Sequence, residues 1–129
     1  MNDVRPVLTS DDVLAMQHLV RRIPVSKALV KAAVTLVRMT RPPEEASPAF
    51  IKEYISWGAG PRASQYLILG AKARAALDGR PMADEDDLRI AAPTVLTHRI
   101  VINFAAEAAG RTAADIVDQL IKETRWQPK

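Results

Sequence analysis

The residues with the clearest chemical potential form one short run in the middle of the chain, Gly58-Ala59-Gly60-Pro61-Arg62-Ala63. Gly60 can cap a helix, and Pro61 suits a first helical position, where no amide donor is needed. Arg62 then falls in the first turn, beside free N–H groups that attract anions. A planar arginine held there could grip a phosphate in bidentate fashion. A plainer role, in which Arg62 pairs with a carboxylate such as Glu53, fits the spacing as well.

Other kinds of reactive site are absent from the sequence. No G-x-x-x-x-G-K-S/T loop is present, so the chain cannot hold a triphosphate in the P-loop manner. There is no cysteine, and His18 and His98 lie in different predicted elements, which argues against the usual nucleophilic sets. The acidic run 84–87 fits the first turn of a helix better than a calcium loop. We therefore expect no metal site and no stand-alone enzyme.

The composition predicts one helical domain. The chain has 129 residues, of which 48% are apolar and 26% charged, the balance of an ordinary globular domain. Aromatic residues make up only 5%, so alanine and aliphatic residues must fill the core, which favours closely packed helices over sheets. No run has the length and apolarity of a membrane span, and the N-terminus lacks the pattern of a secretory leader. A cytoplasmic location is expected.

The net charge of +3 is unevenly distributed. Between Asp12 and Glu44 there is no acidic residue. The basic residues of this interval are Arg21, Arg22, Lys27, Lys31, Arg38 and Arg41. Such a segment can face nucleic acid, an acidic partner protein or nucleotide phosphates. Residues 1–49 contain no aromatic side chain for base stacking, which weighs against nucleic acid.

Hydrophobic periodicity predicts two helices in the first third of the chain. After an irregular lead-in at 1–9, one helix begins at Ser10 with an acidic first turn and runs to Pro24. Its apolar face comprises Val13, Met16, Leu19, Val20 and Ile23. A second helix follows a cap at Ser26 and ends at 41–43. Its buried stripe comprises Leu29, Ala33, Leu36 and Val37. We expect the apolar faces of both helices to be buried.

The rest of the chain predicts further short helices. A third helix covers about 48–57, and a fourth, 63–77, is rich in small residues. The fourth helix carries Tyr66, Gly70, Ala73 and Leu77 along one line. A fifth helix follows the acidic run and is broken by Pro93. The run 100–103 is β-prone without an evident partner, so an extended stretch and a helix start both fit. A last helix follows Thr112, and residues 125–129 should fray. The fold class is all-α, a compact bundle of about five to seven helices.

Several short motifs occur along the chain in a defined order. They are Thr40-Arg41, Gly58-Ala59-Gly60-Pro61-Arg62-Ala63, Gly79-Arg80, Asp86-Asp87-Leu88 and Val95-Leu96-Thr97-His98-Arg99. In this order and at this spacing they resemble the C-terminal part of MoxR-type AAA+ ATPases, over about residues 6–121. The family's usual serine in the central motif is replaced here by Gly60, which still permits a cap but has no hydroxyl.

The resemblance implies that residues 1–129 are a single helical lid domain, and that a P-loop base domain, absent from this chain, normally precedes it. Such a lid helps to close the nucleotide site of a ring-shaped assembly, with ATP and Mg²⁺ held mainly by the base domain. The arginine of the central motif senses the ATP γ-phosphate, and this catalytic role falls on Arg62. The residues implied to lie beside the nucleotide are Gly60, Pro61, Arg62, Ala63 and Tyr66. Tyr66 fits core packing as well. Without the base domain, the chain alone should hydrolyse no ATP.

The expected partners are therefore the base domain of the same protein and neighbouring subunits of the ring, within a parent of chaperone-like activity. His98 and Arg99 would support the lid internally or meet a neighbouring subunit. Two other functions fit the residues: a small basic nucleic-acid-binding domain using 21–41, with steeply salt-dependent affinity, or an adaptor that binds a partner in a helix groove. The ordered motifs favour the lid, and nucleic acid is not expected as a partner.

Overall fold

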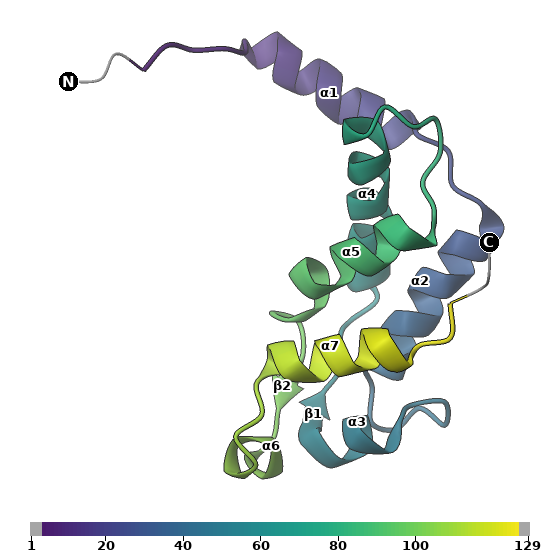
Figure 1. The fold of residues 1–129 in the computed structure, drawn as a ribbon, viewed down its shortest axis with the longest axis vertical. Coiled ribbons are helices and arrows are strands. Elements are labelled where there is room, and N and C mark those ends of the chain that lie inside the picture. The colour runs from purple at the N-terminus through teal and green to yellow at the C-terminus, as the bar shows by residue number, and fades with distance from the viewer. Residues whose placement is uncertain (1–3, 127–129) are drawn as a thin grey trace.

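The computed structural model describes residues 4–126, which form seven helices and one two-stranded sheet. The elements are α1 (Ser10–Arg22), α2 (Lys27–Met39), α3 (Ala49–Tyr54), β1 (Ile55–Trp57), α4 (Arg62–Leu77), α5 (Glu85–Leu96), β2 (Val101–Ile102), α6 (Phe104–Ala108) and α7 (Ala113–Glu123). α1 lies at one end of the molecule beside α4, and the small sheet lies with α3 and α6 at the other end (Figure 1). The predicted all-α bundle is confirmed.

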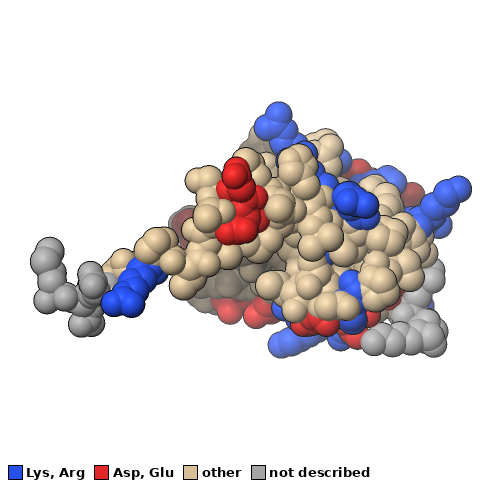
Figure 2. All heavy atoms as spheres, turned by 90° about the horizontal axis from the view of Figure 1, so that it is seen from above, with Lys and Arg blue, Asp and Glu red and all other residues tan. Residues whose placement is uncertain are grey.

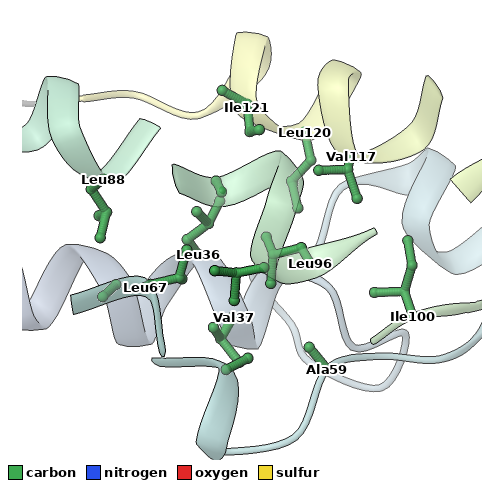
Figure 3. Close-up of a cluster of buried hydrophobic side chains, with 14 of the residues drawn as sticks. Leu36, Val37, Ala59, Leu67, Leu88, Leu96, Ile100, Val117, Leu120 and Ile121 are labelled. Carbon is green, nitrogen blue, oxygen red and sulfur yellow. The ribbon is translucent and has the colours of Figure 1, made fainter. Parts of the chain in front are cut away.

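The core forms where α2, α4, α5 and α7 meet. Each of these helices turns an apolar stripe inward, and the stripes join in one cluster (Figure 3). The largest fully buried apolar side chains are Leu29, Leu36, Val37, Ile51, Leu67, Leu88, Leu96, Ile116, Val117 and Leu120. The stripes of the second and last predicted helices are therefore buried as their periodicity indicated.

Small residues bring α4 and α5 close together. A Cβ placed on Gly70 would lie 3.0 Å from the Cβ of Ala91 on α5, so a larger residue at position 70 would push the helices apart. The buried line of α4 is Ala63, Leu67, Ala71 and Ala75. The predicted line of Tyr66, Gly70, Ala73 and Leu77 is a different face of the helix, on which Tyr66 and Leu77 are exposed.

Three helices begin with capping boxes that the local sequence specifies. The cap and N3 residues are Thr9 with Asp12 for α1, Asp84 with Asp87 for α5, and Thr112 with Asp115 for α7. In each box the two residues satisfy one another's backbone donor. A hydrogen bond from the Thr9 backbone lowers the pKa of Asp12, and one from Thr112 lowers the pKa of Asp115. The acidic run is thus a helix start, as predicted, and α1 is capped one residue earlier than predicted.

The end of the predicted third helix is a strand. α3 ends at Tyr54, and Ile55–Trp57 pairs in antiparallel fashion with Val101–Ile102. The β-prone run therefore does have a partner, which the sequence analysis missed. Asn103 secures the junction, because its backbone N–H donates to the Tyr54 carbonyl at 2.9 Å and its side-chain amide to that of Glu53 at 2.7 Å.

Pro93 does not break the fifth helix, contrary to the prediction. α5 continues to Leu96, and the Thr97 N–H donates to the Pro93 carbonyl at 3.2 Å. Proline removes one hydrogen bond of the helix. Ala92, which precedes Pro93, and Val95, two residues after it, are both buried in the core. Packing of this face therefore outweighs the preference of proline for a helix end.

The apolar face of α1 is exposed, and the expectation that it would be buried was wrong. No residue of α1 is buried, and Val13, Met16 and Leu19 each expose between 42% and 54% of their surface. α1 contacts α4, where Lys72 Nζ donates to the Arg21 carbonyl at 3.0 Å. No helix within residues 4–126 is long and apolar enough to cross a membrane.

Both ends of the chain reach beyond the described residues. Residues 4–9 carry no helix or strand, and 1–3 of the predicted lead-in lie outside the description. Of the predicted frayed tail, 127–129 also lie outside it. Within that tail, Trp126 packs against the core, and its indole N–H donates to the Ile121 carbonyl at 3.0 Å.

Candidate functional site

The start of α4 presents Arg62 to solvent. Pro61 already has helical dihedral angles, and the Ala63 N–H donates to the Gly60 carbonyl at 3.0 Å, so the helix begins within one residue of the predicted position. Arg62 is exposed, and its side chain makes no ion pair or hydrogen bond with any residue of 4–126, Glu53 included. The plainer role as a partner of Glu53 is therefore not observed. The guanidinium is free for a ligand.

The loop that leads to Arg62 is held by the end of α2. The Ala59 N–H donates to the Thr40 hydroxyl at 2.9 Å, and the Ala59 carbonyl accepts from Arg41 Nε at 3.0 Å. The Thr40 hydroxyl donates in turn to the Val37 carbonyl at 2.6 Å. Two of the sequence motifs thus meet in space. No local pattern in the sequence signalled this contact, because it joins residues nineteen apart.

A cleft lies beside this contact. It has a volume of about 510 Å³ and runs between the loop after α2 and the loop before α4. Gly60 and Pro61 line it, together with Arg41 and the exposed Trp57. Gly58 also lines it and allows the two loops to touch, since a Cβ at this position would lie 2.5 Å from the Thr40 carbonyl oxygen.

Tyr66 lies one turn beyond Arg62 on α4 and is not in the core. The guanidinium of Arg99 lies over the Tyr66 ring, 4.7 Å from the ring centroid, in a cation–π contact. Nη1 of Arg99 also donates to the Val95 carbonyl at 2.7 Å and contacts the ring of His98. Arg99 therefore joins the end of α5 to α4, and His98 contacts Arg99. Of the residues predicted to lie beside the nucleotide, Gly60, Pro61, Arg62 and Tyr66 are exposed, whereas Ala63 is buried in the core.

An ion cluster that the sequence analysis missed fixes the other end of α4. Asp87 is only 2% exposed and accepts from Arg80 through both carboxyl oxygens, at 2.9 and 2.5 Å. Burial raises the pKa of Asp87, but hydrogen bonds from Arg80 and the Asp84 backbone, with the charges of Arg80 and Arg74, hold that pKa below its ordinary value. Gly79, with a φ of 67°, turns the chain so that Arg80 can reach back.

Two other expectations concern charge. Within 4–126, no group of three or more acidic, histidine or cysteine side chains could hold a metal ion. In the basic segment 21–41, Arg38 pairs with Glu44 at 2.7 Å, and hydrogen bonding to Arg38 is the main cause of the lowered pKa of Glu44.

Comparison with known proteins identifies the family. Residues 47–120 match the family described as the AAA lid domain. Chaperone MoxR1 of Mycobacterium tuberculosis is 31% identical over 125 residues, and the uncharacterized protein YeaC of Bacillus subtilis is 26% identical over 122 residues. These matches cover 97% and 95% of this chain but 33% and 35% of the relatives. The chain therefore spans about a third of the length of these curated relatives.

A solved structure agrees with this match. The crystal structure of a "putative ATPase" from Cytophaga hutchinsonii superposes with a TM-score of 0.88 at 30% sequence identity, over 99% of this chain and 40% of the other. The chain belongs to the AAA lid domain family, and it is the lid domain of a MoxR-type AAA+ ATPase. The resemblance drawn from the five sequence motifs is confirmed.

Proposed function

We propose that this lid closes the ATP site of a longer AAA+ ATPase and that Arg62 contacts the γ-phosphate there. The observation that carries the proposal is an exposed arginine on the first turn of α4 with no partner among residues 4–126. A guanidinium that has no competing carboxylate can bind phosphate oxygens in bidentate fashion. It would favour the developing charge of phosphoryl transfer without itself forming a bond.

The rest of the nucleotide site would come from another domain. The P-loop and the carboxylates that hold Mg²⁺ are not part of this sequence, so we expect the 129-residue chain alone to turn over no ATP. Gly60, Pro61 and Ala63 place backbone close to Arg62, and Tyr66, whose ring contacts Arg99, would approach the nucleotide. Chaperone-like activity and assembly into a ring belong to the proposal, with the relative named Chaperone MoxR1 as support.

We propose that the base domain of the same protein covers the exposed face of α1. A groove of about 450 Å³ between α1 and α4 is lined by Val13, Met16, Gln17, Val20, Arg21 and Leu69. Seen from the α1 end, much of the surface is neither acidic nor basic, apart from one acidic patch left of the centre of the view and scattered basic side chains (Figure 2). The relatives are about three times as long as the match, so they possess the additional chain that such a surface requires.

The experiment is ATP turnover by the full-length ATPase that carries this lid, wild type against Arg62→Ala, with nucleotide affinity measured in parallel. We expect turnover to fall by about 100-fold or more with binding changed far less, the pattern of an interaction made in the transition state. Arg125→Ala is the matched control, since Arg125 is exposed and lies after α7, away from the start of α4. Equal turnover in Arg62→Ala and Arg125→Ala would refute the role of Arg62.

The α1 surface has its own test. Leu19→Asp should leave the thermal stability of the 129-residue chain nearly unchanged, because Leu19 is exposed in it. In the full-length ATPase the same change should lower stability and turnover by burying an unpaired charge at the domain interface. Hydrogen exchange of α1 that is equally fast in the chain and in the full-length ATPase would contradict this surface assignment.

A further inference from the structure

We propose that Thr40 and Arg41 are positioning residues for Arg62, acting through the backbone of Ala59. This inference rests on the proposed function, since it concerns how the phosphate-contacting arginine is held. Neither side chain touches Arg62. Each side chain binds one backbone group of Ala59, which lies three positions before Arg62 in the chain.

The contact has the form of a clamp. The Thr40 hydroxyl accepts the Ala59 N–H at 2.9 Å, and Arg41 Nε donates to the Ala59 carbonyl at 3.0 Å. Both backbone groups of Ala59 are therefore satisfied by adjacent side chains of one helix end. The Ala59 side chain is itself 1% exposed, so the loop cannot slide along α2 without emptying a core position.

The helix end that supplies the clamp is itself fixed. Thr40 is 1% exposed and its hydroxyl also donates to the Val37 carbonyl at 2.6 Å. The Arg41 carbonyl accepts from the buried Ser47 hydroxyl at 2.6 Å. Thr40 and Ser47 are two of the three buried polar or charged residues within 4–126, the third being Asp87. Two of these three buried residues therefore lie beside one loop. Loss of the Thr40 hydroxyl would leave the Ala59 N–H without its acceptor.

The clamp determines where Arg62 stands because little else holds the first turn of α4. Gly60, Pro61 and Arg62 are exposed, and no side chain caps this helix start. The anchors on either side are Ala59, held by the clamp, and Ala63, which is fully buried. Releasing Ala59 would free the turn on one side. A shift of about 1 Å in a group that meets a transition state can lower a rate by up to about 100-fold.

The test compares variants of one hydroxyl in the full-length ATPase. Thr40→Val removes the hydroxyl at nearly constant volume, and Thr40→Ser keeps it. Thr35→Val is the matched control, because Thr35 lies on the same helix, is exposed, and makes no hydrogen bond with any described side chain. We expect Thr40→Val to lower kcat by about tenfold or more, within the range for a misplaced group. KM for ATP should stay within a factor of about two. Thr40→Ser and Thr35→Val should keep most of the turnover.

Two further measurements separate positioning from general damage. In an Arg62→Ala background, Thr40→Val should cause no additional loss, because a positioning residue acts only through the group it places. Hydrogen exchange on the 129-residue chain should show a faster Ala59 amide in Thr40→Val, with amides in the middle of α2 unchanged. If Thr40→Val does not fold, Arg41→Met removes the second half of the clamp and is measured in the same way.

The outcomes are distinguishable. Unchanged turnover in Arg62→Ala would overturn the proposed function itself. Loss in Arg62→Ala but normal kcat in Thr40→Val and Arg41→Met, with a faster Ala59 amide, would leave the proposed function standing and overturn the positioning role. Equal losses from Thr40→Val in the wild-type and Arg62→Ala backgrounds would also overturn it, since the damage would then not pass through Arg62.

Discussion

Replacing Gly58 with alanine measures how tightly the loop before α4 is pressed against the end of α2. The new Cβ would lie 2.5 Å from the Thr40 carbonyl oxygen and 2.7 Å from both Cα and Cγ of Arg41. Two of these three atoms belong to the backbone, so a change of rotamer cannot remove the clash. Overpacking of this kind costs about 1–3 kcal/mol, and two backbone contacts place the expected loss of stability at about 2–3 kcal/mol.

The same loop offers a matched control in Gly60→Ala. A Cβ on Gly60 would meet no heavy atom within 4 Å, and its φ is not positive, so alanine fits the backbone. A slightly poorer helix cap and a less flexible unfolded chain oppose each other, which keeps the expected change within about 1 kcal/mol. Both substitutions add one methyl group to the same loop. They differ in that position 58 is crowded and position 60 is open.

Thermal unfolding followed by circular dichroism compares the two variants. For a chain of this size, 1 kcal/mol corresponds to a shift in Tm of about 4 °C, so Gly58→Ala should melt about 8–12 °C below the wild type. Gly60→Ala should melt within about 4 °C of it. Equal Tm values for the two variants would refute the close approach of Gly58 to Thr40 and Arg41, and with it the geometry of the clamp.

Further predictions concern the core, the ion cluster and the outer helix. Leu67→Ala empties a fully buried position and should lower the free energy of unfolding by about 2–5 kcal/mol in urea denaturation, whereas a cost below about 1 kcal/mol would contradict the core packing. The lowered pKa of Asp87 contributes stability that is present above its ordinary value of 3.8 and is lost as the pH falls through the lower folded value. Asp87→Asn should therefore lower the free energy of unfolding at pH 7, and the free energy of unfolding of the variant should depend less on pH below about 5. If the variant loses stability below about pH 5 as steeply as the wild type does, the ion cluster is not the cause of that loss. Met16→Gln should change the free energy of unfolding of the 129-residue chain by less than about 0.5 kcal/mol, because Met16 is exposed; a larger loss would mean that α1 is covered.

Features set by nearby residues were predictable from the sequence. The caps at Asp84 and Thr112 follow from a short polar side chain with an acid three positions later. The stripes of α2 and α7 follow from helical periodicity, and the start of α4 from a glycine followed by proline. Arg62 could be singled out because its position in such a turn is itself a local property.

Features set by distant residues were not predictable in the same way. The strand 55–57 forms because 101–102 lies beside it, and neither run is long enough to identify alone. α5 continues through Pro93 because its neighbours are buried, which only the packed structure reveals. The periodicity of α1 indicated an apolar face but not whether this chain covers it. The bond between Thr40 and Ala59 likewise depends on how two helices pack.

The close approach of Gly70 to Ala91 couples any movement of α4 to α5. The helix has sixteen residues, which at about 1.5 Å per residue gives a length of about 24 Å. A tilt of about 10° at its first turn would displace its far end by about 4 Å. α4 and α5 pack closely at Gly70 and Ala91, and Arg80, just after α4, pairs with Asp87 on α5. A tilt of α4 would therefore move α5 as well. A tilt of α4 that began at Arg62 would thereby also move the opposite side of the domain.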